Sequence, residues 1–169
     1  MSNEMYKMVG EFHKAFNHQV SETPTAIPVD TALNRAVWTG EELIEFLYAT
    51  VKGDIGQFSV LYDLFKEGLD AAHNKMIEQK KPVDDIVVAQ ADALVDVEYF
   101  NQGSFNILGV EPFELFKIVQ EANMGKLHDG VPKYRESDGK ILKPLHWEEM
   151  YAPEPRLKAE IERQRKASK

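Results

Sequence analysis

Three glutamates gather in one short stretch of the sequence. Glu41 and Glu42 are adjacent and Glu45 follows three residues later, so a helix would place all three on one side. Like charges at this spacing repel each other, at a cost of about a few tenths of a kcal/mol per pair. Two interpretations stay open for this cluster. It is either a solvated acidic surface near a helix N-terminus, where the helix dipole favours anions, or a site that binds a cation.

Two aspartates lie in an otherwise apolar stretch. Asp92 and Asp96 are four residues apart within Ile86–Phe100, which is apolar almost all round and therefore predicts a buried central helix. Aspartate is a poor helix former, and a buried carboxylate without a partner costs several kcal/mol. Lysine and arginine are absent from Val83 to Leu115, although a distant partner such as Arg35 stays open. We therefore favour a divalent cation, Mg²⁺ or Mn²⁺, bound by carboxylates of both helices.

The complementary positive charges lie in one late segment of the chain. Its cationic and aromatic residues are Lys126, Lys133, Tyr134, Arg135, Lys140, Lys143 and Trp147. Lysine and arginine bind phosphate oxygens, and Asn123 just before them can hydrogen-bond to a base edge or a sugar hydroxyl. The segment alone also fits an ordinary surface loop. Beside a metal site it indicates a nucleotide polyphosphate as ligand, because the metal screens the charge while the lysines contact the outer oxygens.

The composition excludes several other classes of function. The chain has 169 residues, a formal net charge of −8 and no cysteine. The charge argues against binding of nucleic acid or anionic membranes, and the missing cysteine excludes disulfides, thiolate metal sites and cysteine nucleophiles. None of the five histidines has a zinc-binding spacing, and no glycine-rich phosphate loop or G-x-S-x-G motif is present. Since no signal pattern or long apolar run occurs, we expect a cytoplasmic protein without a membrane span.

The candidate residues need a scaffold, and the hydrophobic periodicity predicts a helical one. Apolar residues recur at helical spacing in five segments, residues 3–19, 30–51, 58–76, 85–105 and 111–123. Glycines and prolines from Gly125 to Pro155 predict a loop-rich segment with a short hairpin near Ser137–Gly139. We therefore expect an all-α fold, an antiparallel bundle of about five main helices, within a domain of residues 1–152. Residues 153–169 are expected to form a charged tail or a solvated helix.

Three stretches of the chain follow the motif order of a known superfamily. Glu41-Glu42-x-x-Glu45 resembles an E-E-x-x-E motif, and Asp92 to Asp96 resembles a second acidic motif that is usually E-x-x-D. In this chain Ala93 stands three residues before Asp96, so Asp92 is the available partner. Asn123 to Lys143, including Asp138-Gly139-Lys140, is similar to an N-x-x-K and D-G-K-x-x-K segment. Together they resemble the MazG-like, all-α nucleoside triphosphate pyrophosphohydrolases, which include proteins like phosphoribosyl-ATP pyrophosphohydrolase.

The resemblance implies an Mg²⁺-dependent enzyme, with Mn²⁺ as a second candidate metal. It would cleave the α–β phosphoanhydride of an NTP or dNTP to a nucleoside monophosphate and pyrophosphate. Its role would be house-cleaning, the removal of unwanted nucleotides from the nucleotide pool. The implied metal ligands are Glu42, Glu45, Asp92 and Asp96, with Glu41 as an outer ligand or the group that orients water. The implied phosphate-binding residues are Lys126, Lys140, Lys143 and Arg135. The candidates for base and sugar are Asn123, Phe12, Trp38 and Tyr134.

The resemblance also implies a homodimer or a dimer of dimers. Two alternatives to the proposed reaction stay open at this point. The first alternative is a non-catalytic helical dimer that binds nucleotides or is purely structural. The second is an enzyme for a substrate of the phosphoribosyl-ATP or dUTP type. The sequence contains no pattern that identifies the base.

Overall fold

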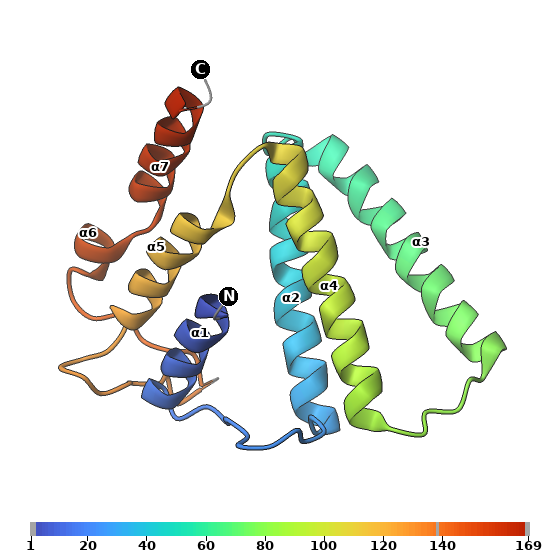
Figure 1. The fold of residues 1–169 in the computed structure, drawn as a ribbon. Helices are drawn as coiled ribbons and strands as arrows, with labels where there is room; N and C mark the ends of the chain where they lie inside the picture. Colours follow the sequence, from blue (N-terminus) through green and yellow to red (C-terminus); the bar gives the residue numbers. More distant parts are fainter. Residues whose placement is uncertain (1–2, 138, 168–169) are drawn as a thin grey trace. The chain divides into compact units, whose positions relative to one another are not determined.

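The computed structural model describes residues 3–137 and 139–167, and the regular structure within these ranges is helical (Figure 1). The helices are α1 Glu4–Ala15, α2 Val29–Thr50, α3 Ile55–Gln79, α4 Ile86–Leu108, α5 Pro112–Met124, α6 Trp147–Tyr151 and α7 Glu154–Ala167. The predicted all-α fold is confirmed, and α1 to α5 correspond to the five predicted segments. Among the described helices, none is both long and apolar enough to cross a membrane.

The chain divides into two compact units. One consists of Met1–Thr23 with Val95–Lys169, and the other of Pro24–Leu94. The segment 153–169, predicted to be a tail or a helix, contains α7 and belongs to the first unit. The boundary at Leu94 falls within α4, which is helical from Ile86 to Leu108.

Local capping explains where the predicted and observed helix ends differ. α3 starts before residue 58 because the side chain of Asp54 accepts a 2.8 Å hydrogen bond from the N–H of Gln57. Asp85 begins α4 in the same way, accepting bonds of 2.9 and 3.1 Å from two N–H groups of the first turn. α1 ends at Ala15, four residues earlier than predicted, and Asn17 beyond it has left-handed backbone with φ 54°.

In the second unit, α2 and α3 contact each other near the turn that joins them, and they diverge from that turn (Figure 1). α4 begins in this unit and is tied to the segment before α2 by one side chain. Gln90 accepts a 2.8 Å hydrogen bond from the N–H of Ile27 and donates a 3.0 Å bond to its carbonyl. Because both backbone groups of Ile27 are satisfied by one amide, the entry to α2 is fixed against the first turns of α4.

In the first unit, α5 is the central element, with α1 and α7 packed against it. The buried apolar residues are Phe16, Ile118, Ala122 and Trp147. Gln120 on α5 donates a 2.7 Å hydrogen bond to the carbonyl of Met8 on α1. Gly125 follows α5 where the ring of Tyr151 approaches the backbone, and a Cβ added there would lie 2.5 Å from that ring. A side chain at position 125 would therefore displace α6 from the end of α5.

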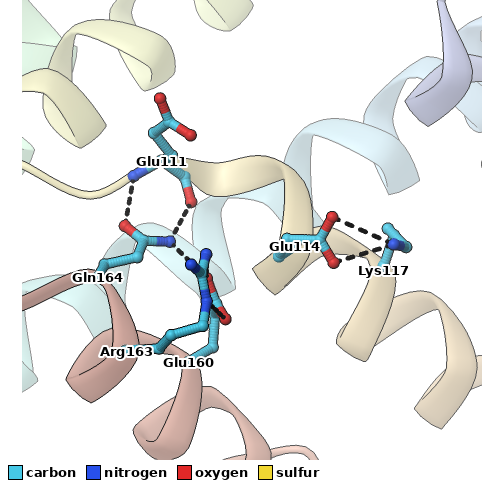
Figure 2. A network of polar contacts seen from close by, with 6 residues as sticks. All are labelled: Glu111, Glu114, Lys117, Glu160, Arg163 and Gln164. Carbon is cyan, nitrogen blue, oxygen red and sulfur yellow. Dashed lines mark hydrogen bonds and ion pairs between the residues drawn. The ribbon is translucent and has the colours of Figure 1, made fainter. Parts of the chain in front are cut away.

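A polar network attaches α7 to the start of α5 (Figure 2). Gln164 accepts a 2.9 Å hydrogen bond from the N–H of Glu111 and donates a 3.0 Å bond to its carbonyl. Glu160 accepts two 2.7 Å bonds from Arg163 and one 2.9 Å bond from Gln164. Donation from Arg163 and then from Gln164 lowers the pKa of the Glu160 carboxyl to about 2.

The predicted hairpin is confirmed between α5 and α6. Tyr134 lies opposite Ile141, and the N–H of Arg135 donates a 2.8 Å bond to the carbonyl of Lys140. Gly139 has φ 70°, a conformation that costs glycine little. Asp138, part of the motif noted in the sequence, lies outside the described residues.

One prediction about burial is wrong for the single chain. α4 was expected to be a buried central helix, yet no described residue of α2, α3 or α4 is buried. Val95, Tyr99 and Phe100 are 66%, 76% and 72% exposed. An apolar pattern all round a helix is typical of a buried one, but this chain leaves the apolar side chains of α4 exposed.

Candidate functional site

Three lysines converge near the end of α5. Lys126 donates a 2.7 Å hydrogen bond to the side-chain oxygen of Asn123. Burial lowers the pKa of the Lys126 ammonium, and the positive charges of Lys143 and Lys140 lower it further. A repulsion of this kind requires charges at close range, so the fold brings together three lysines that lie 17 residues apart in the sequence from first to last. Four of the residues predicted to contact substrate therefore form one cluster, which we call the cationic cluster: Asn123, Lys126, Lys140 and Lys143.

The side chain of Trp147 supports this cluster. It is only 6% exposed, and its indole N–H donates a 3.0 Å hydrogen bond to the carbonyl of Ala122. The ammonium of Lys143 lies 3.9 Å from the ring centroid, and that of Lys126 lies 5.9 Å from it. Both distances fall within the range of a cation–π interaction. In the sequence Trp147 lies among the cations, four residues after Lys143, and that position alone predicts no role for it.

One lysine of the cationic cluster is already paired with a glutamate. Lys143 forms a 2.6 Å ion pair with Glu148, whose side chain is 70% exposed. An exposed pair of this type contributes about 0–1 kcal/mol to stability. It nevertheless shows that an oxygen anion approaches the Lys143 ammonium without steric hindrance.

The other residues predicted to contact base or sugar have separate surroundings. In the first unit, the hydroxyl of Tyr134 donates to the carbonyl of Phe16, and Phe12 stacks on Phe16 with ring centroids 4.3 Å apart. Tyr134 thus connects the hairpin to Phe16, which is buried, and Phe12 packs α1 against the ring of the same residue. In the second unit, Trp38 on α2 is 51% exposed, with the Arg35 guanidinium 5.9 Å from its ring. Their roles toward a substrate stay predictions.

The predicted metal ligands lie on two helices. Glu41, Glu42 and Glu45 are on α2, Asp92 and Asp96 are on α4, and all five side chains are exposed. Within the described ranges, no three carboxylate or imidazole side chains form a group that could hold a metal ion. Because Asp92 and Asp96 are exposed, the desolvation cost that a buried α4 would impose on them, and with it the need for a metal, does not arise in the single chain. What remains in favour of the metal is the donor set, since it is all carboxylate oxygen and thus suits Mg²⁺.

The first unit also contains a cavity that the sequence did not predict. Its volume is ≈ 380 Å³, and its wall includes Phe105, Phe116 and Leu115, with Glu98 and Gln102 at the α4 side. Gln102 donates a 2.7 Å hydrogen bond to Glu98. At 100° per residue Glu98 and Gln102 lie about 100° to 140° around α4 from the side that Asp92 and Asp96 share, and neither aspartate lines this cavity.

Comparison with known proteins decides the family. The sequence profile described as "Phosphoribosyl-ATP pyrophosphohydrolase" matches residues 9–123, more than half of the chain. The chain belongs to the phosphoribosyl-ATP pyrophosphohydrolase family. A crystal structure of "a putative NTP pyrophosphohydrolase" from Exiguobacterium sp. 255-15 is 43% identical to it, with a TM-score of 0.90 and 100% of both chains covered. A search of the curated proteins found no significant match.

Membership of this pyrophosphohydrolase family confirms the resemblance inferred from the three motifs. The matched range contains all five predicted carboxylates and ends at Asn123. The enzyme class is confirmed with it: the chain is a pyrophosphohydrolase, a hydrolase that acts on phosphoanhydrides.

Proposed function

We propose that the enzyme hydrolyses the α–β phosphoanhydride of an NTP or dNTP to a nucleoside monophosphate and pyrophosphate, and that it depends on Mg²⁺. The observation that carries the proposal is the family match, because residues 9–123 contain every carboxylate predicted from the sequence. The cationic cluster supports it independently, since Lys126, which is bonded to Asn123, lies near two further lysines, and such a group of cations suits a polyanion.

The metal would be bound by Glu42, Glu45, Asp92 and Asp96, with Glu41 as an outer ligand or the group that orients the attacking water. Each helix offers its carboxylates on one side at spacings of three or four residues, and oxygen donors are those that Mg²⁺ or Mn²⁺ prefers. A bound divalent cation would supply Lewis acidity and a more acidic water at the phosphoanhydride.

The protein's own groups would position the substrate. Lys126, Lys140, Lys143 and Arg135 would neutralise charge on the phosphate oxygens, and the partial burial of Lys126 strengthens such a contact. Asn123 would orient the nucleotide through its amide while its oxygen holds Lys126. Phe12, Trp38 and Tyr134 stay candidates for contacts with base and sugar.

The enzyme would act as a homodimer or a dimer of dimers. The exposed apolar side chains of α2, α3 and α4 support this, because monomeric proteins rarely leave so large an apolar surface in water. A second chain against these helices would remove water from the carboxylates as well. That would restore the requirement for a counter-ion that the single chain lacks.

Phosphoribosyl-ATP is a second candidate substrate, since the family description names it. It contains the same α–β phosphoanhydride, so the proposed residues would have the same roles. A non-catalytic nucleotide-binding dimer is the remaining alternative.

One experiment separates these candidates. Pyrophosphate release is measured with a panel of NTPs, dNTPs, dUTP and phosphoribosyl-ATP, with Mg²⁺ and with EDTA. Thermal stability is measured in parallel with Mg²⁺ and each nucleotide. The proposal expects Mg²⁺-dependent release from at least one NTP or dNTP. Stabilisation by nucleotide without any pyrophosphate would identify a binding protein, and release from phosphoribosyl-ATP alone would identify the second candidate.

A further inference from the structure

The ring of Trp147 lies under two of the three clustered lysines. Lys143 is 3.9 Å and Lys126 is 5.9 Å from its centroid, while the ring itself is 6% exposed. The indole N–H is bonded to the carbonyl of Ala122, so the ring plane is fixed relative to α5. A fixed aromatic face is therefore built into the base of the cationic cluster.

An aromatic face can order the clustered lysines without neutralising their charge. Lysine side chains are flexible, and the charges of Lys143 and Lys140 both act against the charge of Lys126. A carboxylate would hold them, but it would also neutralise the charge that an anionic ligand needs. The negative face of an aromatic ring attracts ammonium groups without a formal charge of its own. The lysines can then be ordered and remain available to an anion.

Glu148 provides the contrast. Its carboxylate pairs with Lys143 at 2.6 Å and is largely exposed, whereas the ring of Trp147 is buried. An arriving phosphate oxygen would have to compete with this carboxylate for the ammonium. Trp147 and Glu148 thus both hold the Lys143 ammonium, but only Glu148 neutralises its charge.

We propose that Trp147 is a positioning residue of the cationic cluster, which orders Lys143 and Lys126 for a diphosphate group, and that Glu148 is the internal competitor that the diphosphate displaces. The ligand class, pyrophosphate or the β,γ-diphosphate of a nucleotide, rests on the proposed function. The two claims are tested separately because inorganic pyrophosphate is used without divalent cation and no hydrolysis is measured.

The spectroscopic test uses the two tryptophans of the chain. In the full-length Trp38→Phe variant, Trp147 is the remaining tryptophan and is excited selectively over the tyrosines. Titration with inorganic pyrophosphate in EDTA is expected to change its emission saturably as the ammonium groups move from ring to ligand. The matched control is Trp147→Phe, in which Trp38 reports, and its emission is expected to stay constant. Saturable binding without a change of Trp147 emission would contradict the proposal, and so would no binding of pyrophosphate.

The affinity test uses calorimetry with the same ligand. Trp147→Phe keeps an aromatic face but loses the N–H, whereas Trp147→Leu keeps apolar bulk without the face. We expect Trp147→Leu to bind pyrophosphate about 5- to 10-fold more weakly and Trp147→Phe to recover most of that loss. Glu148→Gln is expected to bind about 3-fold more tightly. Equal affinities of the Trp147→Leu and Trp147→Phe variants for pyrophosphate, or weaker binding by Glu148→Gln, would overturn the proposal. If Trp147→Leu does not fold, the affinity of Glu148→Gln alone still decides.

Discussion

The ammonium of Lys126 donates a 2.7 Å hydrogen bond to the side-chain oxygen of Asn123, three residues before it. The sequence suggested that both residues contact substrate, and the fold joins them directly. The bond leaves the amide NH₂ of Asn123 as a donor, while it holds a half-buried ammonium beside Lys140 and Lys143. A cation in such surroundings is costly for the free protein and favourable once an anion arrives.

The first prediction concerns pH. Because the pKa of Lys126 is lowered by burial and by its lysine neighbours, its ammonium loses a proton at lower pH than an ordinary lysine. Pyrophosphate affinity is therefore expected to fall as the pH rises from neutral toward the ordinary lysine range. Calorimetric titrations across this range measure it. Lys126→Arg is the control, since arginine stays charged and should flatten the decline; pyrophosphate itself ionises identically in both series. The same decline in both proteins would exclude Lys126 as its cause.

The second prediction concerns the carboxylates. Glu45→Gln and Asp96→Asn preserve size but remove the charge, and each is expected to reduce kcat/KM at least about 100-fold. Even residues that only support metal ligands typically contribute 10- to 100-fold. Both side chains are exposed, so the melting temperature should change little. Glu67→Gln on α3, an exposed glutamate outside the predicted site, is the matched control and should keep full activity. Wild-type kinetics in Asp96→Asn would remove α4 from the proposed metal site.

The third prediction concerns assembly. Light scattering is expected to give a mass of twice, or four times, the chain mass of 19.3 kDa. Phe100→Lys should shift the population toward the monomer, because it places a charge on the uncovered surface of α4. Phe100 is 72% exposed in the single chain, and Tyr6 on α1 is 71% exposed. Tyr6→Lys is therefore the matched control and should leave the mass unchanged. A monomeric wild-type protein that remains active would show that the apolar helices need no partner.

The fourth prediction concerns α7. Gln164→Ala removes both hydrogen bonds to the backbone of Glu111 and is expected to destabilise the protein by about 1 kcal/mol. Lys158→Ala, an exposed change on the same helix, is the control for helix content.

Acid should weaken the same attachment. The pKa of Glu160 is about 2 in the fold against 4.5 ordinarily, so its stabilising charge is fully present above 4.5 and lost as the pH falls toward 2. The melting temperature of Glu160→Gln should therefore approach that of the wild type in acid and lie below it at neutral pH. A constant difference at every pH would mean that the charge of Glu160 is not what stabilises α7.

The helices could be predicted because hydrophobic spacing and helix-breaking residues act between neighbours in the sequence. Apolar spacing located α1 to α5, and glycines and prolines located the loop-rich segment with its hairpin. Burial was less accessible, since the sequence of α4 shows that it avoids water but not whether its own chain or another chain covers it. The role of Trp147 was inaccessible for a different reason. It depends on where Lys126 and Lys143 lie in space, and no spacing along the chain encodes that.

The central claim is Mg²⁺-dependent pyrophosphate release from a nucleoside triphosphate. The most direct measurement incubates the wild-type enzyme with each NTP and dNTP and quantifies pyrophosphate and orthophosphate with Mg²⁺, with Mn²⁺ and with EDTA. We expect pyrophosphate and nucleoside monophosphate in equal amounts, with release abolished by EDTA and by Glu45→Gln. Release of orthophosphate with a nucleoside diphosphate, or equal rates in EDTA, would contradict it.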